Sequence, residues 1–285
     1  MTVTGVRLQA AVLGSPIAHS LSPVLHVAAY RRLGLAGRSY EAFDVDEAAL
    51  PGFLDELDPG RWCGLSLTMP LKRAVIPLVH SVSETAVSVQ AVNTVLFEHD
   101  GTRRGENTDV PGLIAALAER GVTGVDEAAV LGGGATAASA LAALSSIVQT
   151  GDVDIYVRSP KRVEQLLPVA ERFGLRLRVH GWSDAGDALK SPLVVNTTPA
   201  GAADELTSRM VPAAGTLFDV LYHPWPTPLA AAWQCAGGVV LGGLDLLIHQ
   251  ASLQVELMTG ADPTQRAAVV EAMRVAGTAA LSARG

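Results

Sequence analysis

Three consecutive glycines separate a short apolar run, residues 128–131, from an alanine-rich run. This order predicts a strand, a tight turn and the start of a helix. Gly132, Gly134 and Ala137 fit the spacing G-x-G-x-x-A, in which the first glycine permits the turn and the second admits a pyrophosphate close to the backbone. The N–H groups at the start of the helix would then bind phosphate. A chance match, or a loop for another nucleotide or a methyl-donor cofactor, would give the same pattern.

The strand expected at residues 152–158 decides which nicotinamide cofactor such a loop would serve. A fold that prefers NAD usually ends this strand with an acid that binds the ribose 2′-hydroxyl, but Asp152 and Asp154 lie at its other end. The residues at its close are instead basic or polar: Arg158, Ser159, Lys161 and Arg162. Cations at the start of a helix are unfavourable without an anion, and arginine forms forked hydrogen bonds to phosphate. The pattern favours an NADP(H) site over a solvated helix start with ordinary surface charge.

Lys72 is a further cation whose position suggests chemistry. It lies in the first turn of a helix expected to begin near Pro70, directly after a strand at 62–67. A lysine there is electrostatically misplaced unless an anion lies nearby. An ordinary surface lysine is the alternative.

Two serines and an aspartate are each open to a functional and a structural interpretation. Ser20 and Ser22 flank one leucine, so both hydroxyls could face one small anion. The alternative is that Ser22, followed by Pro23, only caps a helix over residues 22–33. Asp109 precedes an apolar helical pattern, so it too could be only a helix cap.

The composition limits the classes of protein that need to be considered. The chain has 285 residues and a formal charge of −7, with 49% hydrophobic and 17% charged residues, which suits roughly two domains. It lacks an apolar run of about eighteen residues, and Met1–Arg7 lacks signal-peptide features, so no membrane span or leader is expected. The negative charge argues against general nucleic-acid affinity. Cys63 and Cys235 have no metal-type spacing and are expected to be buried thiols in a reducing cytoplasm, with no metal site.

The first part of the chain is expected to mix strands and helices. Strands are predicted at 6–13, 38–45 and 62–67, helices at 22–33, 47–57 and 82–89, and a hairpin at 92–98 and 102–107. Asn93 lies at the entrance of this hairpin, and Asp109 follows its exit into a helix that ends at Gly121.

The second part, from about 125 to 242, alternates strands with helices, which predicts a parallel, doubly wound sheet. The strands are expected at 128–131, 153–158, 175–179, 192–196, 215–220 and 238–241, and the helices at 135–148, 161–173, 184–190 and 226–236. Loops after the carboxyl ends of such strands form a ligand crevice. A long helix at 244–259 and a last helix at 263–282 follow, and the last helix is expected to return and cover the first part.

Along nearly its whole length the chain resembles the shikimate dehydrogenases, including the quinate/shikimate relatives. The matching segments keep the family's order and spacing: Gly14–Pro23, Leu67–Lys72, Ala91–Thr94, Asn107–Asp109, Gly132–Thr136, Arg158–Arg162, Asn196–Gly201, Tyr222–Pro224, Thr227–Leu229 and Gly242–Ala251. The resemblance implies an α/β protein of two domains. An N-terminal α/β substrate-binding and catalytic domain would comprise residues 1–108 with C-terminal helices from about 246 to 285, and a Rossmann-type doubly wound NADP-binding domain residues 109–245.

The resemblance also implies NADP-dependent, reversible reduction of 3-dehydroshikimate to shikimate, on the route to chorismate and the aromatic amino acids. Lys72 matches the catalytic lysine and Asp109 its acidic partner. The positions that match substrate-binding residues are Ser20, Ser22, Thr68, Asn93, Tyr222 and Gln250. Those that match cofactor-binding residues are Glu84, Gly132, Gly133, Gly134, Ala135, Thr136, Arg158, Ser159, Lys161, Arg162, Thr197, Val220 and Gly243.

The chain departs from the family's usual residues at Val27, Ser66, Gln90, Val157 and Ser159. Val157 and Ser159 replace the Asn and Thr on either side of Arg158. Because both Arg158 and Arg162 are retained, the NADP preference is expected to survive.

Two rival functions stay open: a quinate/shikimate dehydrogenase that prefers NAD, and a non-catalytic relative that only binds a ligand. The basic cluster argues against the first, and the presence of both Lys72 and Asp109 against the second. The expected partner is a small-molecule substrate, with no nucleic acid and no membrane, and the protein is expected to be a cytoplasmic monomer or homodimer.

Overall fold

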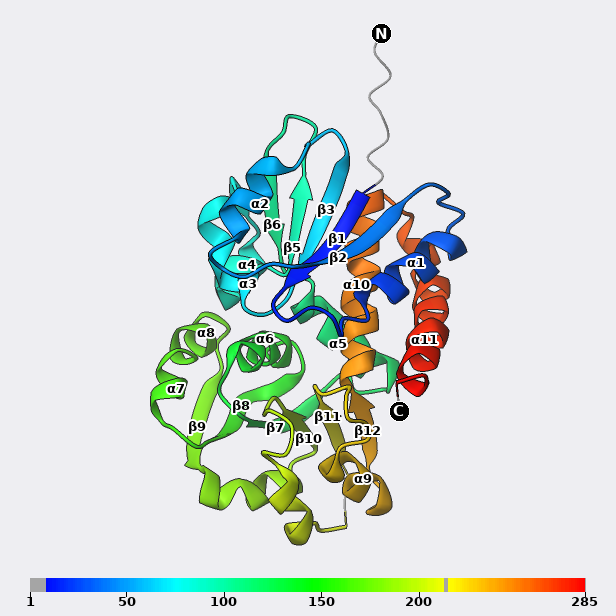
Figure 1. The fold of residues 1–285 in the computed structure, drawn as a ribbon. Coiled ribbons are helices and arrows are strands. Elements are labelled where there is room, and N and C mark those ends of the chain that lie inside the picture. The colour runs from blue at the N-terminus through cyan, green and yellow to red at the C-terminus, as the bar shows by residue number, and fades with distance from the viewer. Residues whose placement is uncertain (1–8, 213–214, 285) are drawn as a thin grey trace. The chain divides into compact units, whose positions relative to one another are not determined.

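The computed structural model describes residues 9–212 and 215–284, which form two compact α/β units (Figure 1). Unit 1 consists of Met1–Asp109 with Ile248–Gly285, and unit 2 of Val110–Leu247. The first predicted strand is described only from Gln9, and the segment Met1–Arg7 lies outside the described residues. Among the described residues, no helix is long and apolar enough to cross a membrane, and no group of three His, Cys, Asp or Glu side chains could hold a metal ion.

The sheet of unit 1 has the strand order β2-β1-β3-β5-β6-β4. Its strands are β1 (Gln9–Gly14), β2 (Ser39–Asp44), β3 (Trp62–Leu67), β4 (Ser81–Val82), β5 (Thr94–Phe97) and β6 (Arg103–Glu106). β1 pairs in parallel with β2 and β3, whereas β5 runs antiparallel to β3 and β6. All of β3 is buried, as expected of a strand covered on both faces.

Helices cover both faces of this sheet (Figure 1). One face carries α2 (Leu50–Glu56), α3 (Leu71–Ala74) and α4 (Glu84–Val89). The other carries α1 (Ser22–Arg32), the part of α10 (Gly243–Thr259) that belongs to unit 1, and α11 (Arg266–Ser282). α11 packs on α1, so the last helix returns to the first part of the chain as the sequence predicts.

Alternate residues of β3 serve these two faces, because successive side chains of a strand point in opposite directions. Leu65 joins the core under α2 and α3. Gly64 lies against α10, where a Cβ atom would be 2.7 Å from Cγ of Met258. The absence of a side chain at Gly64 therefore lets α10 approach the sheet closely.

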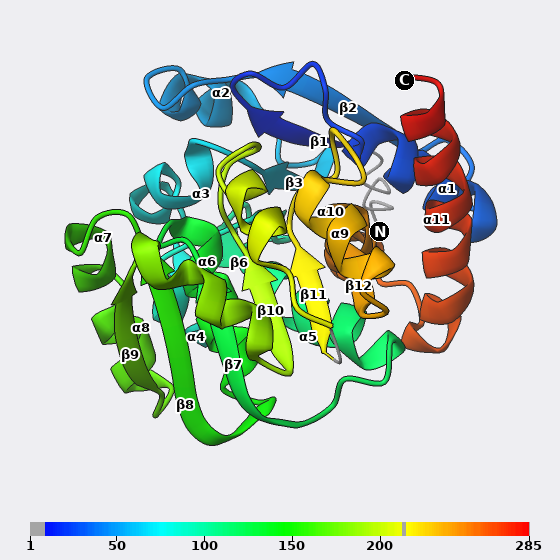
Figure 2. The same cartoon turned by 90° about the horizontal axis from the view of Figure 1, so that it is seen from below.

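The sheet of unit 2 is parallel throughout, with the strand order β12-β11-β10-β7-β8-β9 (Figure 2). Its strands are β7 (Val125–Leu131), β8 (Val148–Val157), β9 (Arg176–Gly181), β10 (Leu193–Asn196), β11 (Thr216–Asp219) and β12 (Val239–Gly242). The helices of this part are α5 (Asp109–Glu119), α6 (Ala135–Leu144), α7 (Lys161–Glu164), α8 (Leu167–Arg172) and α9 (Pro228–Cys235), with 3-10 helices η2 (Trp182–Lys190) and η3 (Asp204–Arg209). The predicted doubly wound parallel sheet is confirmed.

Several boundaries differ from those predicted. α6 ends at Leu144 rather than at 148, because Val148 already begins the long strand β8. The helix predicted at 161–173 is divided into α7 and α8, and Pro168, in the first turn of α8, has no N–H to continue a single helix. The segment predicted as a helix at 184–190 is a 3-10 helix. Helix 47–57 is limited to Leu50–Glu56, and the helix predicted from Val82 begins at Glu84 because Val82 belongs to β4.

The prediction of two buried thiols is wrong for one of them. Cys63 is buried in β3, and burial raises the pKa of its thiol. Cys235 is exposed. It lies two residues beyond the buried Trp233 at the end of α9, and a step of two residues turns a helical side chain to the opposite side.

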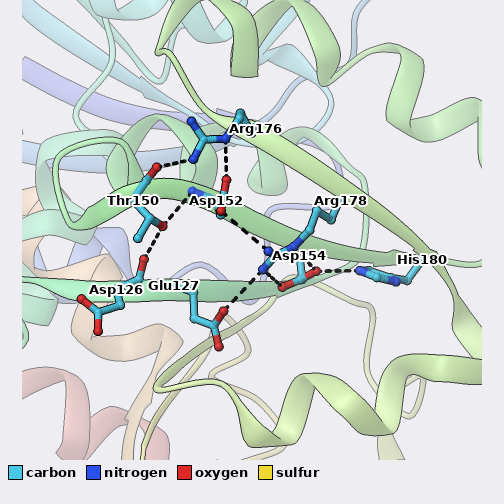
Figure 3. Close-up of polar contacts among 8 residues, drawn as sticks. All are labelled: Asp126, Glu127, Thr150, Asp152, Asp154, Arg176, Arg178 and His180. Atoms are coloured by element: carbon cyan, nitrogen blue, oxygen red, sulfur yellow. Dashed lines mark hydrogen bonds and ion pairs between the residues drawn. The ribbon is translucent and has the colours of Figure 1, made fainter.

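The edge strand β9 is held to β8 by charged side chains as well as by its ladder (Figure 3). Arg176 donates to Asp152 and Arg178 to Asp154, each at 2.6 Å. His180 Nε2 lies 2.6 Å from Asp154. The Arg178 guanidinium, assisted by His180, holds the pKa of Asp154 below its usual range. Both aspartates are thus bound to the neighbouring strand before the end of β8.

A histidine is fully buried between α1 and β2 in unit 1. The ring of His26 stacks on Tyr40 with centroids 3.8 Å apart, and its Nδ1 donates to the Ser22 carbonyl at 2.9 Å. Burial lowers the pKa of His26 from 6.5 to about 4, although the bond to Ser22 opposes this change. The folded state therefore favours the neutral ring.

This burial predicts a dependence of stability on pH. Between pH 6.5 and about 4 the unfolded chain binds a proton at His26 that the folded chain does not, so the free energy of unfolding should fall as the pH is lowered through this range. The loss should total roughly 3 kcal/mol. In urea unfolding at a series of pH values, His26→Phe should show a shallower slope. His99→Phe, at an exposed turn, is the control and should keep the slope; an unchanged slope in His26→Phe would contradict the assignment.

Candidate functional site

Each residue of unit 2 assigned to the cofactor follows the carboxyl end of a strand. The glycine loop follows β7, and the basic cluster follows β8. Thr197 comes directly after β10, Val220 after β11 and Gly243 after β12. The chain proceeds from β7 outward to β8 and β9 and then returns to β10 on the other side of β7. Loops diverge at such a switch point, which is where doubly wound sheets hold their ligands.

The glycines after β7 differ in how closely their neighbours approach. Gly132 has a φ of +104°, and a Cβ atom there would lie 2.6 Å from Oγ1 of Thr197. A Cβ atom on Gly133 would lie 3.1 Å from both Val157 and Arg162. Gly134 precedes α6 and has open space where a Cβ would be. Ala135 and Thr136, the first residues of α6, are exposed, so the start of this helix is accessible to a ligand.

The basic cluster lies beside this loop. Arg158, Lys161 and Arg162 are exposed, and Ser159 is half-buried. The Arg158 guanidinium lies over the indole of Trp182, 5.2 Å from the ring centroid, and donates to the Ala202 carbonyl at 3.0 Å. These contacts hold one cation in place while its outer side stays in solvent. Trp182 is a neighbour of Arg158 that sequence reasoning did not identify.

Two of the departures from the family's pattern can be placed here. Val157 is buried at the end of β8, beside Gly133, so it packs under the glycine loop and offers no polar contact. Ser159, one residue past Arg158, keeps a hydroxyl. Near this loop, Arg162 keeps its charge beside Gly133, and Thr197 keeps a hydroxyl beside Gly132.

The loop after β11 is fixed by a buried carboxylate. Asp219 is fully buried and accepts hydrogen bonds from Oγ1 of Thr227 at 2.7 Å and from N of Leu221 at 3.2 Å. Burial raises the pKa of Asp219. A Cβ atom on Gly243 would collide with the carbonyl oxygen of Val220. Val220 and Gly243 are thus neighbours at the ends of β11 and β12.

In unit 1, a second cluster is centred on the carboxylate of Asp109. Lys72 Nζ lies 2.7 Å from Oδ2 of Asp109, and Asn93 Nδ2 donates to Oδ1 at 2.8 Å. The side chains of Lys72 and Asp109 are 31% and 13% exposed. The same Asn93 amide lies 3.3 Å from Oε1 of Gln250 on α10. Four residues assigned to catalysis or substrate binding are thereby brought together from four places in the chain.

The local backbone explains how these side chains meet. Thr68 N donates to the Leu13 carbonyl at 2.9 Å as the chain leaves β3, and Val92 N donates to the Lys72 carbonyl at 2.8 Å. Asn93 N donates to the Glu106 carbonyl at 3.0 Å, so the start of β5 lies beside the end of β6, from which Asp109 follows. Thr68 is half-buried and lies at the end of β3, next to the short helix that carries Lys72.

The serine pair takes a different arrangement from the predicted helix cap. Leu21 is the N-cap of α1 and makes no side-chain cap bond, while Ser22 is already the first helical residue. The Ser22 amide donates to Oγ of Ser20 at 3.3 Å, so Ser20 serves the helix start. Ser22 is buried and Ser20 half-buried. The interpretation of Ser22 as a simple cap is therefore wrong.

Two assigned residues belong to the other unit from most residues assigned to the same ligand. Tyr222, assigned to substrate, is half-buried in unit 2 after β11. Glu84, assigned to the cofactor, is exposed in unit 1 as the first residue of α4. Both assignments continue to rest on the resemblance.

Sequence reasoning missed residues that complete the Asp109 cluster. Thr108 N donates to Oδ1 of Asn93 at 2.8 Å, and Gln254 Nε2 donates to the Asn93 carbonyl at 3.1 Å. Gln254 follows Gln250 by four residues on α10, a spacing that places both on one face of a helix. That spacing was the available signal.

The arrangement in unit 1 is suited to proton transfer and charge stabilisation. An ammonium group fixed against a carboxylate, with its outer side partly exposed, can stabilise an oxyanion and donate a proton to it. The amide groups of Asn93 and Gln250 and the hydroxyl of Thr68 are donors and acceptors suited to a polyhydroxylated molecule. The residues of unit 2 are suited to a dinucleotide phosphate.

Comparison with known proteins gives consistent results. Residues 12–95 match the family model described as the shikimate dehydrogenase substrate binding domain. A protein named shikimate dehydrogenase (NADP(+)) from Thermus thermophilus is 39% identical over 261 residues, which cover 90% of this chain and 94% of the relative. A protein of the same name from Chlorobium phaeovibrioides is 32% identical over 264 residues, covering 87% of this chain and 89% of the relative.

Solved structures show the same similarity. The shikimate dehydrogenase of Mycobacterium tuberculosis has a TM-score of 0.85 at 38% identity, covering 95% of this chain and 99% of its own. A Thermus thermophilus shikimate 5-dehydrogenase was solved in complex with NADP(H) and shikimate. It has a TM-score of 0.80 at 36% identity, covering 94% of this chain and 99% of its own. A quinate dehydrogenase from Corynebacterium glutamicum, in complex with NAD, has a TM-score of 0.82 at 26% identity, covering 94% of this chain and 99% of its own.

Proposed function

Because the chain belongs to the shikimate dehydrogenase family, we propose that it catalyses the reversible, NADP-dependent reduction of 3-dehydroshikimate to shikimate. The observation that carries the proposal is the contact of Lys72 with Asp109 at 2.7 Å, with Asn93 on the other carboxylate oxygen. The reaction serves chorismate and aromatic amino acid biosynthesis. It takes place in the cytoplasm, where nicotinamide cofactors are recycled, in a protein that acts as a monomer or homodimer.

Unit 1 holds the substrate in this proposal. Asn93, Gln250, Thr68 and Asp109 contact the ring hydroxyls, and Ser20 and Ser22 bind the carboxylate, with Tyr222 nearby. Lys72 stabilises the negative charge that grows on the C3 oxygen and donates a proton to it. Asp109 accepts a hydrogen bond from Lys72 and so keeps the ammonium aimed at that oxygen. In the reverse direction Lys72 accepts the proton.

The residues of unit 2 fit NADP(H), which supplies the hydride when bound. The glycines at 132–134, followed by Ala135 and Thr136, leave room for a pyrophosphate at the start of α6. Arg158, Ser159, Lys161 and Arg162 contact the 2′-phosphate. Thr197 lines the glycine loop, Val220 and Gly243 lie by the nicotinamide, and Glu84 contributes from unit 1.

The first test is turnover of the purified protein, followed by absorbance at the NADPH band. With shikimate as the substrate, NADP⁺ should be reduced faster than NAD⁺, because the exposed cations after β8 favour a 2′-phosphate. Faster reaction with quinate or NAD⁺ would support the rival dehydrogenase instead. No turnover in any combination would support a ligand-binding role.

Replacement of the proposed acid tests the role of Lys72. Lys72→Ala should lower kcat by roughly 10²- to 10⁴-fold, the usual contribution of a positioned acid or base. The KM for shikimate should change far less, because Asn93 and Gln250 remain. Lys190→Ala is the matched control, since Lys190 pairs with Asp187 on the exposed surface of unit 2, and it should keep the wild-type kcat. A kcat near wild type in Lys72→Ala would exclude Lys72 as the acid.

Replacement of one arginine tests the cofactor preference. Arg158→Ala should raise the KM for NADP⁺ by roughly 10- to 100-fold, as expected for the loss of charge-assisted hydrogen bonds. The KM for NAD⁺, which lacks the 2′-phosphate, should change little. Arg176→Ala removes an exposed arginine that pairs with Asp152 on the same sheet and should leave both constants unchanged. Equal increases for the two cofactors would show that Arg158 does not contact the 2′-phosphate.

A further inference from the structure

A buried chain of hydrogen bonds connects Asn93 and Thr94 to Tyr40 through Gln254 and Ser66. Gln254 Nε2 donates to Oγ1 of Thr94 at 2.9 Å and to the Asn93 carbonyl at 3.1 Å. Ser66 Oγ donates to Oε1 of Gln254 at 2.8 Å, and the Tyr40 hydroxyl donates to Ser66 at 2.6 Å. Each of these five residues is at most 5% exposed. The chain thus joins β2, β3, α10 and β5 without contact with solvent.

The direction of the bonds follows from the Asn93 carbonyl, which can only accept and so requires Nε2 of Gln254 on its side and Oε1 toward Ser66. Burial raises the pKa of Tyr40, so its hydroxyl stays protonated and donates to Ser66. The single hydroxyl proton of Ser66 then goes to Gln254, which leaves the Gln254 amide nitrogen facing Thr94. The single hydroxyl proton of Thr94 goes to Oδ1 of Asn93 at 2.9 Å.

The orientation of the Asn93 amide is decided by these donors. Its Oδ1 accepts from Thr94 and from the backbone N of Thr108, so its Nδ2 faces Asp109. A reversed amide would place oxygen against the Asp109 carboxylate and NH₂ against the Thr108 N–H, which is unfavourable at both ends. The donor from Thr108 is fixed in the backbone, whereas the donor from Thr94 can rotate unless Gln254 occupies its oxygen.

We propose that Gln254 is a positioning residue that acts through Thr94 to orient the Asn93 amide, and so to hold the Asp109 carboxylate against Lys72. Gln254 does not contact the substrate or the reacting atoms. Ser66 orients the Gln254 amide through its hydrogen bond to Oε1, and the Tyr40 hydroxyl donates a hydrogen bond to Ser66. The kinetic consequences rest on the proposed function, whereas the orientation of Asn93 does not.

The kinetic test uses two variants that differ in one chemical property. Gln254→Glu keeps the shape but cannot donate to Thr94 while the introduced carboxyl is ionised, and Gln254→Leu cannot donate at any pH. At a pH at which the introduced carboxyl is ionised, which burial moves above the usual range for Glu, both should lower kcat by roughly 10- to 100-fold, the scale of a small misplacement of catalytic groups, with a smaller change in the KM for shikimate. As the pH is lowered, the buried carboxyl of Gln254→Glu becomes protonated and regains a donor.

The ratio of wild-type to variant kcat should therefore narrow at low pH for Gln254→Glu and stay constant for Gln254→Leu. A purely structural role would not produce this difference. Ser252→Ala is the matched control, because Ser252 is equally buried on α10 but donates to the His249 carbonyl, outside the chain. A kcat of both Gln254 variants within twofold of wild type, or ratios for both that do not change with pH, would overturn the proposal.

A second measurement separates this proposal from the proposed function. The sequence contains asparagine only at positions 93, 107 and 196, so protein labelled with ¹⁵N-asparagine gives three side-chain amide pairs, which can be assigned by removing each asparagine in turn. Gln254→Leu should shift the amide protons of Asn93 and leave those of Asn196, in unit 2, unchanged. An unshifted Asn93 pair would overturn the positioning role even if the wild type is active, and a shifted pair would support it even if no turnover is found.

Discussion

The carboxylate of Asp109 is the group on which the arrangement in unit 1 depends. One of its oxygens lies against Lys72 and the other accepts from Asn93. A carboxylate with both oxygens bound to donors has one orientation, and it gives the ammonium beside it one orientation too. The hairpin of β5 and β6 makes this possible, because the bond from Asn93 N to the Glu106 carbonyl places the entry of one strand beside the exit of the other.

The two units use charge in opposite ways. In unit 1 the ion pair of Lys72 with Asp109 is supported by neutral, buried amides and hydroxyls, which fix orientation without the cost of removing more charges from water. In unit 2 the cations after β8 remain exposed, and only Arg158 is steadied by an aromatic ring. Exposed cations of this kind attract an anion from solution, and their charged groups stay hydrated until the anion binds.

The parts of this protein that could be predicted from sequence are those that local patterns determine. Alternating strands and helices predicted the parallel sheet of unit 2, and the glycine spacing predicted the turn after β7. Contacts between distant side chains could not be predicted in this way. Gln254 is 160 residues from Thr94, and the contact of Arg158, after β8, with Trp182, after β9, depends on the pairing of these two strands. The Ser20–Ser22 segment was ambiguous for a different reason, since cap and anion site require the same residue types.

Unit 1 is built from two separate stretches of chain, Met1–Asp109 and Ile248–Gly285. This affects the order in which the two units can fold during synthesis. Residues 110–247 leave the ribosome before the helix that carries Gln250 and Gln254 is complete. Unit 2 can therefore form its sheet from contiguous chain. One face of β3 stays uncovered until α10 has been synthesised. The unit that begins first is finished last, and a nascent chain that lacks its last forty residues has its glycine loop but neither glutamine.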